Sequence, residues 1–219
     1  MLKDAGAREL LFNKYGVRKI PVVAKGDKWV FGQMLDVVAK FVGLEGTGIE
    51  RLAPPQLFEK QRLVYAAGQR IIRQFPDSSM NERVIPNRER VIRNLCYHVF
   101  RIGEAFLESW NGVEYSTTLA DNPPGDTMQT GAQIAGYGGH VWQQCESWWA
   151  GLEDRALSRT MQTYYGDTPA HKVYERVTWH SAQHCRQLAA VLERMGIQPD
   201  RPLTAEDLAG LPMPYRLWE

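Results

Sequence analysis

Two histidines, His180 and His184, stand four residues apart in a segment with helical periodicity. Side chains with this spacing on an α-helix project from the same face, one turn apart, so both imidazoles can reach one metal ion. The apolar positions of the segment step by three and four residues, and they are Val173, Val177, Leu188, Val191, Leu192 and Met195. The pair therefore lies on or beside the buried face of its helix. It is either a metal site or a buried polar network, and the spacing favours a metal site.

A third histidine, His98, lies on another amphipathic segment, residues 87–110. The apolar stripe of that segment is formed by Ile92, Leu95, Val99, Ile102 and Phe106. His98 falls three residues after Leu95 and four before Ile102, so we expect it to face the interior. A third histidine on an apolar stripe strengthens the metal interpretation of the pair.

Four amphipathic helices are predicted in the main body of the chain, and they cover residues 55–74, 87–110, 131–152 and 169–195. A loop is expected from 112 to 130, and the tail at 198–219 has one short helical turn at 205–208. Four helices of this length, with one long crossover, pack as a four-helix bundle. The expected fold class is therefore mainly α.

The first 44 residues are expected to form a small α/β segment. The predicted order is a helix at 7–15, a loop entering a strand at 17–24, a second strand at 28–31 and a helix at 33–42. Two glycines and a Pro-Pro pair mark residues 45–54 as the linker. The predicted domains are therefore 1–44 and 55–219.

The order of elements in the first segment, with Ile20-Pro21-Val22-Val23 before the strand and Gly32 before the last helix, resembles the C-terminal half of a glutaredoxin or thioredoxin-like domain. In that family the proline is cis, and its flanking backbone receives the peptide part of a thiol such as glutathione. The family's Cys-x-x-Cys half is missing and the segment has no cysteine, so thiol exchange is not expected. The segment is either a truncated relic that packs on the main domain or a thiol-docking surface at Ile20, Pro21 and Val22. A natural start upstream of Met1 is a third alternative.

The main body resembles the DinB/YfiT-like family of metalloenzymes through two stretches, Asn94-Leu95-Cys96-Tyr97-His98 and Thr178 to Leu188, and through its closing Leu211 to Trp218. That family has a helical bundle with one metal-binding histidine from the second helix and a His-x-x-x-His pair from the last long helix. The resemblance implies that His98, His180 and His184 bind a divalent metal, and imidazole ligands suit Zn, Ni or Fe. It also implies a thiol-dependent transferase or isomerase, with glutathione or another low-molecular-weight thiol as cosubstrate.

Other candidates for the chemistry are fewer. His140 and Glu104 are weak candidates for a general base, because His140 could face the cavity of the bundle and Glu104 follows His98 on the same helix, where it could orient a ligand. Cys96 and Cys185 point away from the adjacent histidines around the helix, so neither is expected to be a ligand.

Composition narrows the classes of partner and the cellular compartment that we expect for this protein. The net charge of +1 gives no sign of a nucleic-acid or membrane partner, and no apolar run has the length of a membrane span. Three widely spaced cysteines indicate no disulfide framework, which fits a cytoplasmic protein. An unpaired sheet edge in the first segment makes a homodimer possible.

Three functions remain open. The first is a metal-dependent thiol S-transferase or isomerase acting on a small electrophile. The second is a metal-activated-water hydrolase, although Ser181 stands where the glutamate of a His-Glu-x-x-His protease would be. The third is a non-catalytic, stress-associated metal-binding bundle.

Overall fold

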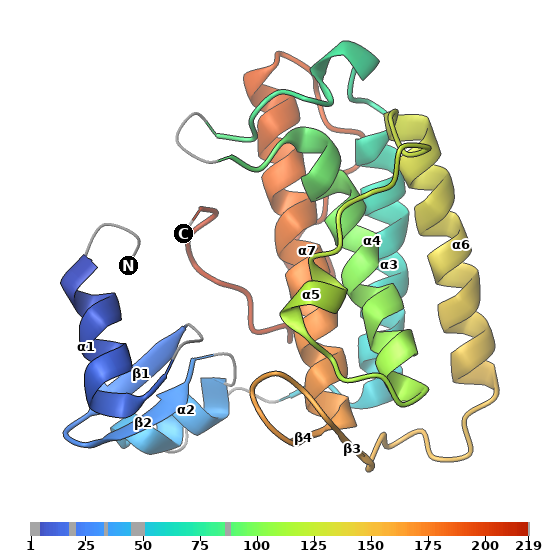
Figure 1. Ribbon diagram of the computed structural model, residues 1–219. Helices are drawn as coiled ribbons and strands as arrows, with labels where there is room; N and C mark the ends of the chain where they lie inside the picture. Colours follow the sequence, from blue (N-terminus) through green and yellow to red (C-terminus); the bar gives the residue numbers. More distant parts are fainter. Residues whose placement is uncertain (1–4, 18–20, 33–34, 45–50, 86–88, 219) are drawn as a thin grey trace. The chain divides into compact units, whose positions relative to one another are not determined.

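Helices dominate the computed structural model, which describes residues 5–17, 21–32, 35–44, 51–85 and 89–218 (Figure 1). The expectation of a mainly α chain with a small sheet near its start is confirmed. The chain divides into two units, Met1–Glu50 and Arg51–Glu219. Within the described ranges, no helix is both long enough and apolar enough to cross a bilayer.

The first unit has the predicted order of helix, strand, strand and helix, and its elements are α1 (Ala5–Tyr15), β1 (Val22–Lys25), β2 (Lys28–Phe31) and α2 (Leu35–Val42). The strands pair antiparallel with Val22 opposite Phe31. Gly26 has a φ of +65°, which the tight turn between the strands requires. The Tyr15 hydroxyl donates to the backbone oxygen of Gly26 over 2.6 Å and ties α1 to the hairpin.

Pro21 precedes the hairpin and is exposed. Its backbone oxygen accepts a hydrogen bond from the Gly32 amide over 2.9 Å. A Cβ at position 32 would lie 3.2 Å from the Pro21 side chain, so the close approach favours glycine there. Val22 is half-buried, and Ile20 lies outside the described residues. The thiol-docking role of Ile20, Pro21 and Val22 therefore stays a prediction.

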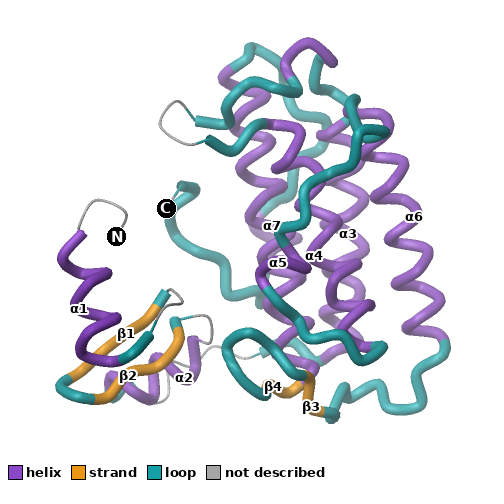
Figure 2. The backbone as a smooth tube through the Cα atoms, in the orientation of Figure 1, coloured by secondary structure: helices purple, strands orange, loops and turns teal. Residues whose placement is uncertain are grey.

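The second unit contains four long helices, which are α3 (Pro54–Ile72), α4 (Ile92–Trp110), α6 (Gly131–Ala150) and α7 (Ala170–Arg194). Figures 1 and 2 show them side by side, and α3 and α4 each contact both α6 and α7. Buried apolar side chains from all four form one core. A Cβ at Gly138 of α6 would collide with the Phe100 ring of α4, so glycine lets these two helices approach closely.

The predicted start of α4 was five residues too early. The helix begins at Ile92, and Val91 instead pairs with Arg83 as an antiparallel bridge. The amide of Ile92 donates to the Glu82 backbone oxygen over 2.9 Å. This pairing satisfies the first backbone donors of α4, which a helix leaves unpaired.

The region expected to be a loop contains a one-turn helix, α5 (Thr117–Ala120). The Ser116 hydroxyl accepts a hydrogen bond from the Leu119 amide at its start. The Arg101 Nε of α4 donates to the Leu119 backbone oxygen over 3.0 Å and holds α5 against α4. Two further short strands, β3 (Thr160–Met161) and β4 (Thr168–Pro169), pair before α7, and α8 (Ala205–Leu208) forms where the sequence predicts a helical turn.

Candidate metal centre

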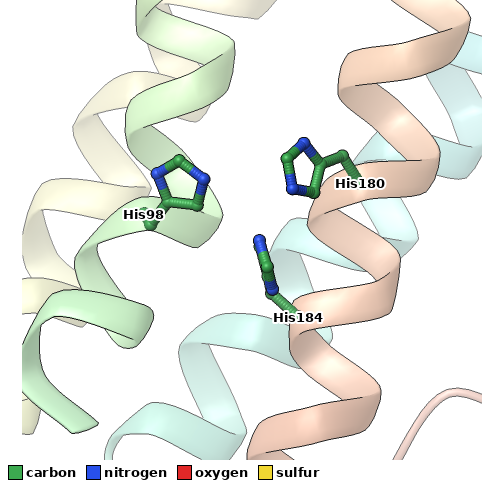
Figure 3. Close-up of side chains that lie close together, drawn as sticks. All are labelled: His98, His180 and His184. Carbon is green, nitrogen blue, oxygen red and sulfur yellow. The ribbon is translucent and has the colours of Figure 1, made fainter. Parts of the chain in front are cut away.

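The three histidines come together between α4 and α7. Figure 3 shows the imidazole of His98, from α4, facing those of His180 and His184, from successive turns of α7. One ring nitrogen from each lies within 4.8 Å of the other two. The ring centroids are 5.4 Å apart for His98 and His180, 5.1 Å for His98 and His184, and 4.6 Å for His180 and His184. Three imidazoles in this arrangement could hold one metal ion.

All three imidazoles are neutral at physiological pH. Burial lowers the pKa of His98 and of His180 well below the ordinary value, and the neighbouring His184 lowers both further. Burial also lowers the pKa of His184 to about 4, against a hydrogen bond to the Gln187 amide oxygen that raises it. Metal binding requires neutral imidazole, so the environment that disfavours protons prepares the ligands.

A hydrogen bond fixes the tautomer of His184. The Gln187 amide nitrogen donates to the Leu217 backbone oxygen over 2.9 Å, which turns the amide oxygen toward the imidazole. That oxygen lies 2.7 Å from Nδ1 of His184, and because a carbonyl oxygen only accepts, Nδ1 carries the proton. The lone pair of His184 is therefore on Nε2, the atom left for a metal.

Two ring nitrogens have no hydrogen-bond partner among the described residues, although both are buried. They are Nδ1 of His180 and Nε2 of His184. An unpaired buried polar atom costs about 1–3 kcal/mol, so two of them in one cluster of imidazoles indicate a shared partner that the described chain does not supply. A buried polar network would pair these nitrogens with protein groups. The unpaired nitrogens fit a metal-binding cluster better.

His98 and Ala120 of α5, a helix that the sequence did not predict, line the same pocket. The backbone of Ala120 acts to raise the pKa of the His98 imidazole, against the larger effect of burial. The Asp121 carboxylate, 3.7 Å from Nδ1 of His98, also lies 3.8 Å from the Arg90 guanidinium. Partners of this kind set the orientation and basicity of a ligating histidine.

A small pocket of about 40 Å³ opens beside the cluster. Its lining residues are His98, Ile102, Tyr115, Thr117, Ala120, Asp121, Tyr164, Arg176 and His180. A water molecule needs roughly 10–15 Å³ in this measure, so the pocket has room for a few small atoms next to the histidines. Three protein ligands with such a space are typical of catalytic metal sites, which keep one coordination position for water or substrate.

Sequence reasoning missed Tyr115, Asp121 and Arg176 at this pocket. Arg176 precedes His180 by four residues, so the helical spacing that links His180 to His184 also places Arg176 on their face. The four-residue spacing was therefore a sequence signal for Arg176. Tyr115 and Asp121 flank α5, where no periodic pattern marks them.

The structure places Glu104 and His140 elsewhere. Both line a separate hollow of about 770 Å³ between α4 and α6 that contains none of the three histidines. The Glu104 carboxylate accepts hydrogen bonds of 2.6 Å from both Arg101 and Tyr137. His140 is exposed, and its Nε2 lies 3.2 Å from the Gln144 amide nitrogen. Their role as bases at the cluster stays a prediction without structural support.

The cysteines also lie apart from the cluster. Cys96, Cys145 and Cys185 are free and buried, and burial raises the pKa of each thiol. The Cys185 thiol faces the Val64 backbone oxygen at 3.6 Å. None of the three is prepared as a thiolate ligand.

Comparison with protein-family models, with curated proteins and with solved structures found no match to this chain. The assignment of the site therefore depends on the geometry of the chain itself.

Replacing Gln187 with leucine should weaken metal binding by roughly tenfold to a hundredfold, because His184 loses the partner that fixes its tautomer. Competition with a chelating indicator measures the affinity. Gln183→Leu is the matched control, since Gln183 also donates to the Leu217 backbone oxygen, over 2.8 Å, and its side-chain hydrogen bonds within the described chain go to the tail and to Arg186 and not to a metal-binding imidazole. Equal losses in the two variants would contradict a specific role of Gln187.

The lowered pKa values should make the metal-free protein sensitive to acid. The unfolded chain binds protons near pH 6.5, whereas folded His184 binds one only near pH 4. The free energy of unfolding should therefore fall as the pH decreases through this window, by about 1.4 kcal/mol per pH unit for each such histidine. Urea unfolding at several pH values measures how steeply this free energy depends on pH. His184→Gln should reduce the number of protons taken up on unfolding by one. An unchanged slope in that variant would contradict the buried, neutral state of His184.

Proposed function

We propose that this protein is a metal-dependent enzyme of the DinB/YfiT-like type, in which His98, His180 and His184 bind a divalent ion. The observation that carries the proposal is the pair of buried, unpaired nitrogens on His180 and His184 within a cluster of three neutral imidazoles. In this proposal α3, α4, α6 and α7 form the family's four-helix bundle. The ligand set suits Zn, Ni or Fe.

The proposed reaction is the transfer or isomerisation of a small electrophile with the help of a low-molecular-weight thiol such as glutathione. A bound divalent ion would supply Lewis acidity and would favour the thiolate form of a thiol at neutral pH. The resemblance of the main body to thiol-dependent enzymes supports this choice, and so does the resemblance of the first unit to part of a glutathione-binding fold.

Several residues around the histidines would have defined roles in this function. Gln187 holds the proton of His184 on Nδ1, so that Nε2 stays available. Ile102 and the hydrocarbon parts of Tyr115 and Tyr164 limit the access of water to the pocket. The small volume of the pocket limits what can lie beside the histidines to a few non-hydrogen atoms.

A second candidate function is a hydrolase. The sequence offered no carboxylate base near the histidines, but the structure places Asp121 in their pocket. Burial raises the pKa of Asp121, which is the direction expected for a general base. The position of Asp121 in the pocket is the observation that supports this second function.

Two assays on the metal-loaded protein separate these functions. For the transferase, glutathione should react with a small electrophile such as chlorodinitrobenzene at a rate that falls to background in His184→Gln. For the hydrolase, an activated ester should be cleaved without thiol, and Asp121→Asn should abolish that cleavage. Ester cleavage alone would contradict the thiol proposal, and inactivity in both assays would favour a non-catalytic metal-binding protein. A homodimer stays a prediction.

A further inference from the structure

The Arg176 guanidinium contributes a positive charge to the lining of the pocket. Its terminal nitrogen donates to the Tyr164 hydroxyl over 3.3 Å, and its guanidinium lies 5.7 Å from the centre of the Tyr165 ring. Its Nε is buried and has no hydrogen-bond partner, and no carboxylate of the described chain forms an ion pair with it. Asp121, the acidic residue of the pocket, lies closest to Arg90 and His98 instead. The guanidinium therefore has donors available for a ligand.

Tyr115 provides a second unused donor in the same pocket. Its side chain is 1% exposed, and its hydroxyl has no hydrogen-bond partner among the described residues. Burial raises the pKa of this hydroxyl, so it carries its proton at neutral pH and can donate it. A buried hydroxyl without a partner is costly, and a ligand acceptor at this position would relieve that cost.

The charges around the pocket favour an anion. The three imidazoles are neutral, so a divalent ion held by them would keep both of its positive charges. Arg176 adds one positive charge on the pocket wall, and the charge of Asp121 is offset by Arg90. Beside these charges, an anionic group would be attracted and a cationic group repelled.

The size of the pocket selects the kind of anion. A volume of about 40 Å³ corresponds to roughly three water-sized probes. A carboxylate has three non-hydrogen atoms and a flat shape that matches a guanidinium, whereas a phosphate group has five. We propose that the substrate or cosubstrate bears a carboxylate, and that the Arg176 guanidinium and the Tyr115 hydroxyl bind it beside the metal-binding histidines. This inference rests on the proposed function, because it assigns a substrate group to the same site.

The experiment uses the full chain loaded with Co(II), whose thiolate complexes absorb in the near-ultraviolet. Mercaptoacetate, mercaptoethanol and cysteamine present one thiol with an anionic, a neutral and a cationic end. We expect mercaptoacetate to bind roughly tenfold to a hundredfold more tightly than mercaptoethanol, and cysteamine to bind most weakly. Acetate, which has no thiol, should bind as measured by calorimetry.

Arg176→Met should remove the preference for mercaptoacetate and most of the binding of acetate. Arg62→Met is the control for net charge, because Arg62 is an exposed residue of α3 outside the pocket lining, and this variant should leave the preference in place. Tyr115→Phe should weaken acetate binding severalfold without lowering the stability of the free protein, since its hydroxyl has no partner to lose. A purely structural role of Tyr115 would not produce that combination.

The outcomes separate this inference from the proposed function. Acetate binding that depends on Arg176, without a thiolate absorption from any thiol, would support the carboxylate site and contradict the thiol function. A thiolate absorption with equal affinities for the three thiols would support the thiol function and overturn the carboxylate site. Equal losses in Arg176→Met and Arg62→Met would also overturn it, because a general effect of net charge would then explain the binding.

Discussion

Ser181 on α7 donates its hydroxyl hydrogen to the backbone oxygen of Val99 on α4, over 2.8 Å. The donor directly follows His180, and the acceptor directly follows His98, so this buried bond ties the two helices together at the cluster. A helix rises about 1.5 Å per residue, and a shift of one or two residues would separate His98 from the other two imidazoles. The contact between α4 and α7 is therefore the constraint on which the site depends. It also gives Ser181 a structural role at the position where a protease of the His-Glu-x-x-His type has its base.

Parts of the chain far apart in sequence support the cluster from two sides. The tail reaches His184 through the Leu217 backbone and Gln187, and α5 reaches His98 through Ala120 and Asp121. Burial keeps the imidazoles neutral, while arginines supply positive charge around them. Burial keeps the imidazole lone pairs free for the proposed metal, whereas the positive charge of the arginines favours the proposed carboxylate.

Sequence periodicity predicted the long helices and the inward-facing position of their histidines for a clear physical reason, whereas the joining of the three in one site was implied by the family resemblance. Spacings of three and four residues determine which side chains share a helix face, and His98, His180 and His184 all obey that rule. This rule could not predict α5, because a one-turn helix is too short to show periodicity. Tyr115 and Asp121 reach the pocket only through the tertiary path of that segment, and the link from Gln187 to Leu217 joins residues thirty positions apart. Arg176 could have been found from its spacing to His180, whereas the placement of Glu104 and His140 in another hollow could not.

The most direct test of the account is X-ray absorption spectroscopy of the protein loaded with stoichiometric zinc. The account predicts a first shell with three imidazole nitrogens at about 2.0–2.1 Å and one further light atom, and the loss of one imidazole in His184→Gln. A shell that contains cysteine sulfur or only oxygen, or a protein that does not retain zinc, would contradict the three-histidine site.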